Sequence, residues 1–338
     1  MNISAHSNPG RNLAMDLVRA TEAGALGALK HIGMGDKNAA DDAAVQAMRN
    51  ALSGMPLNGI VVIGEGEKDE APMLANGEYV GNGEGVLMDI AVDPIDGTTL
   101  TSEGGPGAIS VIAASNRGTM FDPGPIVYMD KVVVGSRASS SFDPQAPLCD
   151  QIKNVASALG KDMSEMMVAV LKRDRHKDLV EAIRSTGARV RLFGDGDVAM
   201  AIAAALPGTG VDMLMGVGGT PEGVIAAAAL KCLGGNIYGK LFPRDQAEHD
   251  AGVDFGFRMD AIITIDDLVA GDNCFFAATG ITSGEFLDGA KHLDGSEGFT
   301  DEHHIRTSSV AYRSATGTVR EIRGTHNLTK MEALGISL

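Results

Sequence analysis

The sequence predicts an α/β protein that folds as two subdomains. In the second half, short apolar strands alternate with helical segments, which is typical of layered α/β folds. The first half places two helical segments before a series of apolar strands. The 338 residues are about twice the length of a common domain, so one chain can form two connected units.

The segments of the first half are assigned from the spacing of their apolar side chains. Residues 12–32 and 40–52 show helical spacing, and a Gly and a Pro follow the second helix. Strands are expected at residues 59–63, 87–93, 108–115 and 131–135. Residues 139–147 are rich in Ser, Asp and Pro and form the candidate linker. The predicted subdomains are therefore residues 1–145 and 146–338.

The second half is assigned as three consecutive strand–helix pairs. The strands are expected at residues 166–171, 189–193 and 211–215, and the helices at 174–185, 198–206 and 223–233. Residues 275–279 predict a further strand, and Ala315-Thr316-Gly317 predict the turn of a hairpin.

Composition and charge exclude several classes of function. The chain has 28 Lys and Arg against 44 Asp and Glu, and the resulting net charge of −16 has the wrong sign for binding nucleic-acid phosphates. No segment has the apolar length of a membrane span or the apolar core of a signal peptide. Cys149, Cys232 and Cys274 are odd in number and contain no CxxC pair, so neither a disulfide framework nor a zinc site is expected. We therefore expect a cytoplasmic protein with no nucleic-acid or membrane partner.

Acidic side chains follow the predicted strands or open the predicted helices. They are Glu65 and Glu67, Asp93 and Asp96, Glu222, and Asp41 and Asp42. Asp and Gly at strand ends are also ordinary turn residues, and for Asp96-Gly97 alone the two interpretations are equally supported. The whole set favours function, because converging carboxylates repel by about 3 kcal/mol per pair at ~5 Å and need cations to hold them together. Ligand sets made only of oxygen select Mg²⁺ or Mn²⁺ over zinc.

A metal-loaded acidic site suits an anionic substrate when fixed basic groups assist it. The candidate basic side chains are Lys37, Arg173, Arg175 and Arg191. Taken singly, Lys37 and Arg191 are better explained as solvated surface charges. Arg173 and Arg175 are better placed, because they lie at the end of a predicted strand where a helix begins. The neighbouring His176 is interpreted as a structural polar residue.

The glycine-rich segment at residues 216–223 follows a predicted strand and opens a predicted helix. Thr220 is a candidate N-cap, with Pro221 at the first helical position. Free amides at such a position bind phosphate or another anion. A dinucleotide site is not favoured, because Pro221 occupies the third glycine position of the GxGxxG pattern.

The motifs taken together resemble those of a known enzyme group. Asp93-Pro94-Ile95-Asp96-Gly97-Thr98, with Glu65 upstream, resembles the signature of the lithium-sensitive, Mg²⁺-dependent phosphatases. The segments at residues 35–41, 62–67, 195–198 and 218–223 narrow the resemblance to the bacterial class II fructose-1,6-bisphosphatases. The resemblance extends over nearly the whole chain.

The resemblance implies the fold and the site. The fold would be a layered α-β-α-β-α sandwich of the sugar phosphatase type, assembled as a homo-oligomer, usually a dimer or tetramer. The implied metal ligands are Asp41, Glu65, Asp93, Asp96 and Glu222, with the Ile95 carbonyl as a further possibility and Mg²⁺ or Mn²⁺ as the cofactor. The candidate catalytic side chains are Thr98, which would orient the attacking water, together with Asp69 and Lys37. The implied substrate contacts are Asp96, Gly97, Thr98, Tyr128, Arg173, Asp174, Arg175, Asp195, Gly196, Asp197 and Gly219.

This sequence departs from the family pattern at two places. Asp174 stands where the family commonly has Pro between two basic residues, and an added carboxylate there could alter binding of the distal phosphate. Leu74-Ala75 stand where the family often has Tyr after Ala-Pro-Met. Neither change touches an implied metal ligand, so the substrate is more open to question than the chemistry.

The predicted function is removal of the 1-phosphate of fructose 1,6-bisphosphate in gluconeogenesis. The alternative within the class is sedoheptulose-1,7-bisphosphatase activity, alone or in addition, and an inositol-phosphate phosphatase is less well supported. From another class, a non-catalytic sugar-phosphate-binding regulator could keep the same pocket. The discriminating observation is metal-dependent release of phosphate.

Overall fold

The computed structural model describes residues 12–65, 74–293 and 303–333. The helices are α1 (Ala14–Leu29), α2 (Lys37–Ser53), α3 (Thr98–Glu103), α4 (Ser136–Ser139), α5 (Leu148–Leu159), α6 (Lys177–Ser185), α7 (Asp197–Ala205), α8 (Thr220–Leu233), α9 (Gln246–Phe255), α10 (Ile265–Leu268) and α11 (Leu328–Ala333). The strands are β1 (Asn58–Ile63), β2 (Tyr79–Val80), β3 (Leu87–Asp96), β4 (Ile109–Asn116), β5 (Tyr128–Val134), β6 (Met167–Leu171), β7 (Arg189–Phe193), β8 (Met213–Gly219), β9 (Asn236–Leu241), β10 (Cys274–Gly280), β11 (Lys291–His292), β12 (His304–Arg313) and β13 (Thr318–Asn327).

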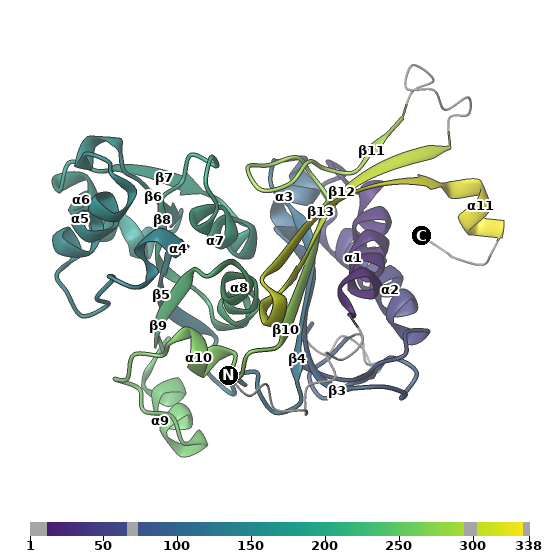
Figure 1. Cartoon of the computed structure of the whole chain (residues 1–338), viewed down its shortest axis with the longest axis horizontal. Helices are drawn as coiled ribbons and strands as arrows, with labels where there is room; N and C mark the ends of the chain where they lie inside the picture. The colour runs from purple at the N-terminus through teal and green to yellow at the C-terminus, as the bar shows by residue number, and fades with distance from the viewer. Residues whose placement is uncertain (1–11, 66–73, 294–302, 334–338) are drawn as a thin grey trace, which may run out of the picture.

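These elements form five layers, which confirms the predicted α-β-α-β-α sandwich. The large sheet runs β11-β12-β10-β4-β3-β1-β2, with β13 paired to β12, and the small sheet runs β7-β6-β8-β5-β9. Helices α1 and α2 cover the outer face of the large sheet, α7 and α8 lie between the two sheets, and α5 and α6 cover the outer face of the small sheet (Figure 1). The middle layer therefore contacts both sheets.

The composition of α8 explains its central place. Ten of its fourteen residues are buried, and the run from Val224 to Leu230 is apolar without interruption. A helix that is apolar on all sides is stable only when it is covered on all sides. Ile225 and Leu230 pack in the same cluster as Val133 of the small sheet and Phe276 of the large sheet, so α8 joins the two sheets.

The predicted strands and helices are observed with small shifts at their ends. The strand predicted at residues 87–93 continues to Asp96 through an irregularity in its pairing with β4, and β5 begins earlier than expected, at Tyr128. The sequence assignment missed α5, α9 and β9. The two sheets also divide the chain differently from the predicted boundary at residue 145, because β5 pairs in the small sheet and β10 to β13 pair in the large one.

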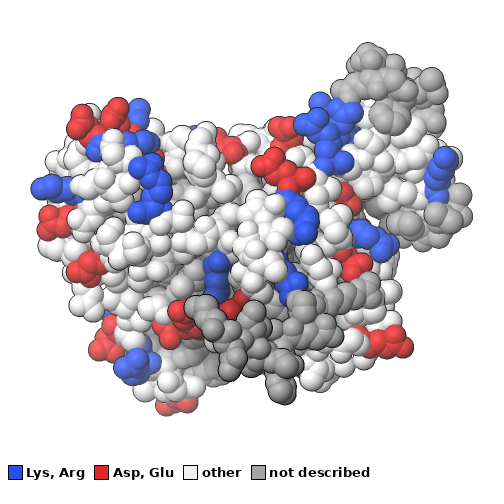
Figure 2. All heavy atoms as spheres, viewed as in Figure 1, with Lys and Arg blue, Asp and Glu red and all other residues white. Residues whose placement is uncertain are grey.

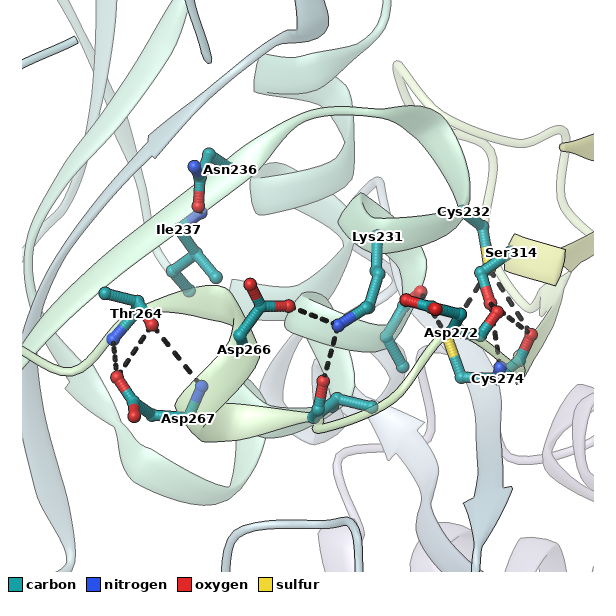
Figure 3. Close-up of polar contacts among 12 residues, drawn as sticks. Lys231, Cys232, Asn236, Ile237, Thr264, Asp266, Asp267, Asp272, Cys274 and Ser314 are labelled. Atoms are coloured by element: carbon teal, nitrogen blue, oxygen red, sulfur yellow. Dashed lines mark hydrogen bonds and ion pairs between the residues drawn. The ribbon is translucent and has the colours of Figure 1, made fainter. Parts of the chain in front are cut away.

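The three cysteines are all free, yet two of them meet. Cys232 lies in the last turn of α8 and Cys274 begins β10, and their buried Sγ atoms lie 3.9 Å apart (Figure 3). The adjacent Lys231 points the other way and binds Asp266.

Surface charge is mixed on the face shown in Figure 2, where acidic and basic side chains alternate rather than form one acidic field. Among the described helices, none has the length and hydropathy of a membrane span.

Candidate active site

The end of β3 and the turn after it present two carboxylates. Asp93 Oδ1 accepts a hydrogen bond from the Ile95 amide at 3.0 Å, which closes a tight turn. Asp96 is only 3% exposed and accepts hydrogen bonds from the amides of Val198, at 3.3 Å, and Ala199, at 2.9 Å. Both amides belong to the first turn of α7, whose positive end favours a carboxylate. The β3 turn is therefore anchored to the middle layer.

Three more elements bring the remaining predicted ligands to Asp93. Asp41 lies in the second turn of α2 and is buried, Glu65 follows β1, and Glu222 lies in the first turn of α8. Burial raises the pKa of Asp93 well above its usual value, and the charges of Asp96, Glu65, Glu222 and Asp41 raise it further. The other four predicted ligands thus lie within electrostatic reach of Asp93.

The pKa values of two other acids of the cluster, Asp96 and Glu222, are raised as well. Burial raises the pKa of Asp96 to about 8 although the Ala199 amide opposes the shift, and the charges of Asp197 and Glu222 add to it. Burial also raises the pKa of Glu222, and the Lys131 ammonium acts against this rise. Such shifts are what carboxylates show when they are buried and lie close to other carboxylates.

The chemistry of this donor set fits a hard divalent cation. Every predicted ligand atom is a carboxylate oxygen, and Glu222 Oε2 is buried without a hydrogen-bond partner in the described part of the chain. Within the same residues, no three acidic, His or Cys side chains are already spaced to hold a metal ion. The predicted ligands therefore lie near one another but are not spaced as they would be around a bound cation, which agrees with the repulsion between like charges.

Thr98 opens α3, and its hydroxyl does not cap this helix. Gly97, in the left-handed region at φ 100°, is the N-cap residue and has no side chain with which to cap. The Thr98 hydroxyl instead donates to the Ile95 carbonyl at 3.2 Å. Thr98 therefore does not act as the N-cap of α3.

Of the two other catalytic candidates, Lys37 is described by the structure and Asp69 is not. Lys37 is exposed at the first residue of α2, and its ammonium donates to the Thr99 hydroxyl at 2.9 Å, beside the β3 turn. Asp69, like the neighbouring acid Glu67, lies outside the described residues. Asp42 is exposed on α2 and does not face the cluster of Asp41.

The predicted substrate residues between β7 and α7 surround the same turn. Asp195 Oδ2 accepts the Thr99 amide at 3.0 Å, and Gly196 adopts φ 83° at the N-cap of α7. Asp197 is the first residue of α7 and binds the ammonium of Lys131 at 2.5 Å. The two side-chain contacts fix the start of α7 against α3 and β5.

The predicted phosphate-binding residues lie at the end of the small sheet. Arg175 is held by a hydrogen bond to the Val217 carbonyl at 2.8 Å, and its guanidinium carbon lies 5.0 Å from the centre of the Tyr128 ring. Arg173 donates to the Gly194 carbonyl at 2.8 Å. Asp174, the departure from the family pattern, has a side chain that is 95% exposed and pairs with Lys177.

Arg191 and His176, which the sequence analysis considered, make structural contacts outside the carboxylate cluster. Arg191 pairs with Glu285, so its charge is already matched. His176 Nδ1 lies 2.6 Å from the Leu171 carbonyl, and Nε2 accepts the Val217 amide at 2.8 Å. Both ring nitrogens are used, which supports the structural interpretation of His176.

The sequence assignment missed Lys131, which is 2% exposed on β5. The sequence of the strand nevertheless indicated that this lysine is buried. Strand alternation places Lys131 on the same face as Met129 and Val133, both of which are fully buried. A lysine in that position must have a buried partner.

Comparison with known proteins shows which family the chain belongs to. The family model described as bacterial fructose-1,6-bisphosphatase, glpX-encoded, matches residues 11–326. The chain belongs to this family. It is 42% identical over 331 residues to the class 2 fructose-1,6-bisphosphatase of Haemophilus influenzae, and the match covers 94% of this chain and 97% of that one. It is 39% identical over 336 residues to fructose-1,6-bisphosphatase 1 class 2 of Escherichia coli, with 95% and 97% covered.

A solved structure, the extragenic suppressor protein suhB of Bartonella henselae, is similar at a TM-score of 0.32 and 17% identity. That similarity covers 57% of this chain and 72% of the other. The residues from Asp93 to Thr98 and from Gly219 to Glu222, on which the site is built, lie within the span that the fructose-1,6-bisphosphatase family model matches.

Proposed function

We propose that this chain hydrolyses the 1-phosphate of fructose 1,6-bisphosphate to give fructose 6-phosphate and phosphate. The observation that carries the proposal is the gathering of four carboxylates around that of Asp93, near the start of α7 and α8. Membership of the bacterial fructose-1,6-bisphosphatase family supports the same substrate. Mg²⁺ or Mn²⁺ would be held by Asp41, Glu65, Asp93, Asp96 and Glu222.

The cations, when bound, would supply charge to the scissile phosphate and acidify the attacking water. The residues of the chain do the positioning. The α7 amides hold Asp96 in one orientation. The Thr98 hydroxyl would orient the water, because it can exchange its bond to the Ile95 carbonyl for one to the water. Lys37 lies beside the same turn, where its ammonium would face a phosphate oxygen.

The far end of the substrate would be bound at the small sheet. Arg175 is fixed by the Val217 carbonyl and by the Tyr128 ring, so little side-chain freedom is lost when it binds a phosphate. A pre-oriented guanidinium suits a phosphate that does not react. Asp174 would have little effect on that phosphate, because its carboxylate is exposed and paired with Lys177.

Two alternatives are separated from this proposal by a single assay. Sedoheptulose-1,7-bisphosphatase activity differs only in the sugar, and a non-catalytic regulator would bind sugar phosphate without releasing phosphate.

A cytoplasmic location and a dimeric or tetrameric assembly are further proposals made from the sequence.

The test is phosphate release from a panel of fructose 1,6-bisphosphate, sedoheptulose 1,7-bisphosphate and inositol 1-phosphate. Each substrate is assayed after exhaustive chelation and after adding back Mg²⁺ or Mn²⁺. We expect the highest kcat/KM with fructose 1,6-bisphosphate and no activity in chelator. Full activity after chelation would exclude the metal mechanism, and substrate binding without turnover would favour the regulator.

A further inference from the structure

Lys131 is a buried cation beside a site that is itself built for cations. Its ammonium lies 2.5 Å from Asp197 Oδ2 and 3.0 Å from the carbonyl oxygen of Gly219. Only 2% of Lys131 and 9% of Asp197 are exposed. A buried ammonium is stable only when its partners are in place, so this pair specifies a definite local arrangement.

The two partners begin the two helices of the middle layer. Asp197 is the first residue of α7, and Gly219 is the N-cap residue of α8. The sequence prediction of Thr220 as the N-cap is therefore wrong by one residue, since Thr220 is already the first residue of the helix. The turn that Asp197 opens also supplies the amides bound to Asp96, and the turn after Gly219 carries Glu222. One ammonium therefore connects the two helix starts that present predicted metal ligands.

Gly218 leaves the space that this ion pair occupies. A Cβ at Gly218 would lie 2.0 Å from Asp197 Oδ2 and 2.9 Å from Lys131 Nζ, although its φ lies outside the left-handed region. The missing side chain is thus required by the ion pair and not by the backbone conformation.

Asp197 is also close to the predicted metal ligands. The amides of the two residues after it, Val198 and Ala199, bind the Asp96 carboxylate, and the ammonium that binds Asp197 also binds the Gly219 carbonyl, three residues before Glu222. An unpaired carboxylate in this place would be one more ligand for a divalent cation. If Asp197 is not to bind the cation, another group must hold its carboxylate.

We propose that Lys131 is a positioning residue, which holds Asp197 toward the hydroxyl groups of the sugar substrate and prevents its carboxylate from joining the metal ligands. The substrate half of this inference rests on the proposed function. The metal half does not, because it concerns only the residues around the cation.

The test compares Lys131→Met with the wild type in two separate measurements. The first gives KM and kcat for fructose 1,6-bisphosphate, and the second gives the Mn²⁺ dissociation constant by titration without substrate. We expect KM to rise by about tenfold or more, because Asp197 is no longer held for the sugar. We expect Mn²⁺ to bind at least as tightly as in the wild type, because a positive charge is removed and a carboxylate is released. A merely structural role would weaken both.

Lys231→Met is the matched control. Lys231 also pairs with one carboxylate and one backbone carbonyl, at 2.5 Å to Asp266 Oδ1 and 2.8 Å to the Val269 oxygen. It lies at the opposite end of α8 from Glu222, beside α10 (Figure 3). This variant should keep the KM and the Mn²⁺ affinity of the wild type.

Two further variants keep the inference testable if Lys131→Met does not fold. Lys131→Met combined with Asp197→Asn removes both charges, which buried pairs tolerate better than the loss of one. Its KM should equal that of Asp197→Asn alone, since Lys131 acts through Asp197. Gly218→Ala should raise KM as Lys131→Met does, because the added methyl displaces the ion pair.

Three results would overturn the inference. The first is weaker Mn²⁺ binding in Lys131→Met, and the second is an unchanged KM in that variant. The third is a fold-increase in KM for the variant that combines Lys131→Met with Asp197→Asn that equals the product of the fold-increases of the two single variants. Absence of phosphate release by the wild type would instead refute the proposed function. The comparison of Mn²⁺ affinities would still decide whether Lys131 keeps Asp197 from the metal.

Discussion

Metal binding at this site should release protons, and the pKa of Asp96 gives the number that this residue releases. Its pKa is raised from 3.8 to about 8, chiefly by burial. At pH 7 a group with this pKa is about 0.9 protonated, and at pH 9 about 0.1. A carboxylate must lose its proton to bind a cation. Mn²⁺ binding should therefore release about 0.9 proton from Asp96 at pH 7 and about 0.1 at pH 9.

The same shift fixes how the stability of the metal-free protein depends on pH. The pKa of Asp96 is higher in the folded state than in the unfolded state. Its contribution to the free energy of unfolding is therefore fully present below pH 4 and is lost as the pH rises through 8. Between pH 6 and pH 7 the folded state holds nearly one more proton than the unfolded state. The free energy of unfolding should fall by about 1.3 kcal/mol over that interval through Asp96 alone.

Two assays check these numbers against the variant Asp96→Asn. Calorimetric titration of Mn²⁺ in buffers of different ionisation enthalpy counts the released protons. Urea unfolding in chelator at pH 6 and pH 7 gives the change in stability, and subtracting the values for Asp96→Asn removes the contribution of all other groups. The reasoning is refuted if wild type and variant show the same pH slope, or if proton release does not fall between pH 7 and pH 9.

The remaining predictions concern single side chains of the site. Asp93→Asn should lower kcat by about 100-fold or more and keep the circular dichroism of the wild type, since it removes a predicted metal ligand worth several kcal/mol of charge stabilisation; wild-type turnover would place the metal elsewhere. Arg175→Ala should raise KM more than it lowers kcat, as steady-state kinetics would show, and a collapse of kcat at constant KM would assign Arg175 to the reacting phosphate. Thr98→Ala should bind substrate but lose about 10²-fold in kcat, while Thr98→Ser retains most activity. Equal kcat in the two Thr98 variants would exclude a role for the hydroxyl.

Much of the architecture could be predicted because it depends on short-range patterns. The apolar spacing of α1 and α2 and the apolar runs of β3 and β4 are visible in the sequence, since helices and strands repeat within a few residues. Asp93, Asp96 and Thr98 were recognisable for the same reason, since they occupy one turn. In α5 the apolar residues Ile152, Val155 and Ala156 also recur at helical spacing, and the sequence assignment overlooked them, whereas α9 buries only Glu248 and Gly252 and carries no comparable apolar pattern.

The tertiary structure alone decided which of these pieces meet. Asp96 binds amides 102 and 103 residues away, and Lys131 binds groups 66 and 88 residues away. No local pattern encodes such pairings, because they arise only when the middle layer is packed between two sheets. The buried lysine shows the difference most clearly. Its place on the inner face of β5 follows from strand alternation, but its partners follow from the way α7 and α8 begin side by side.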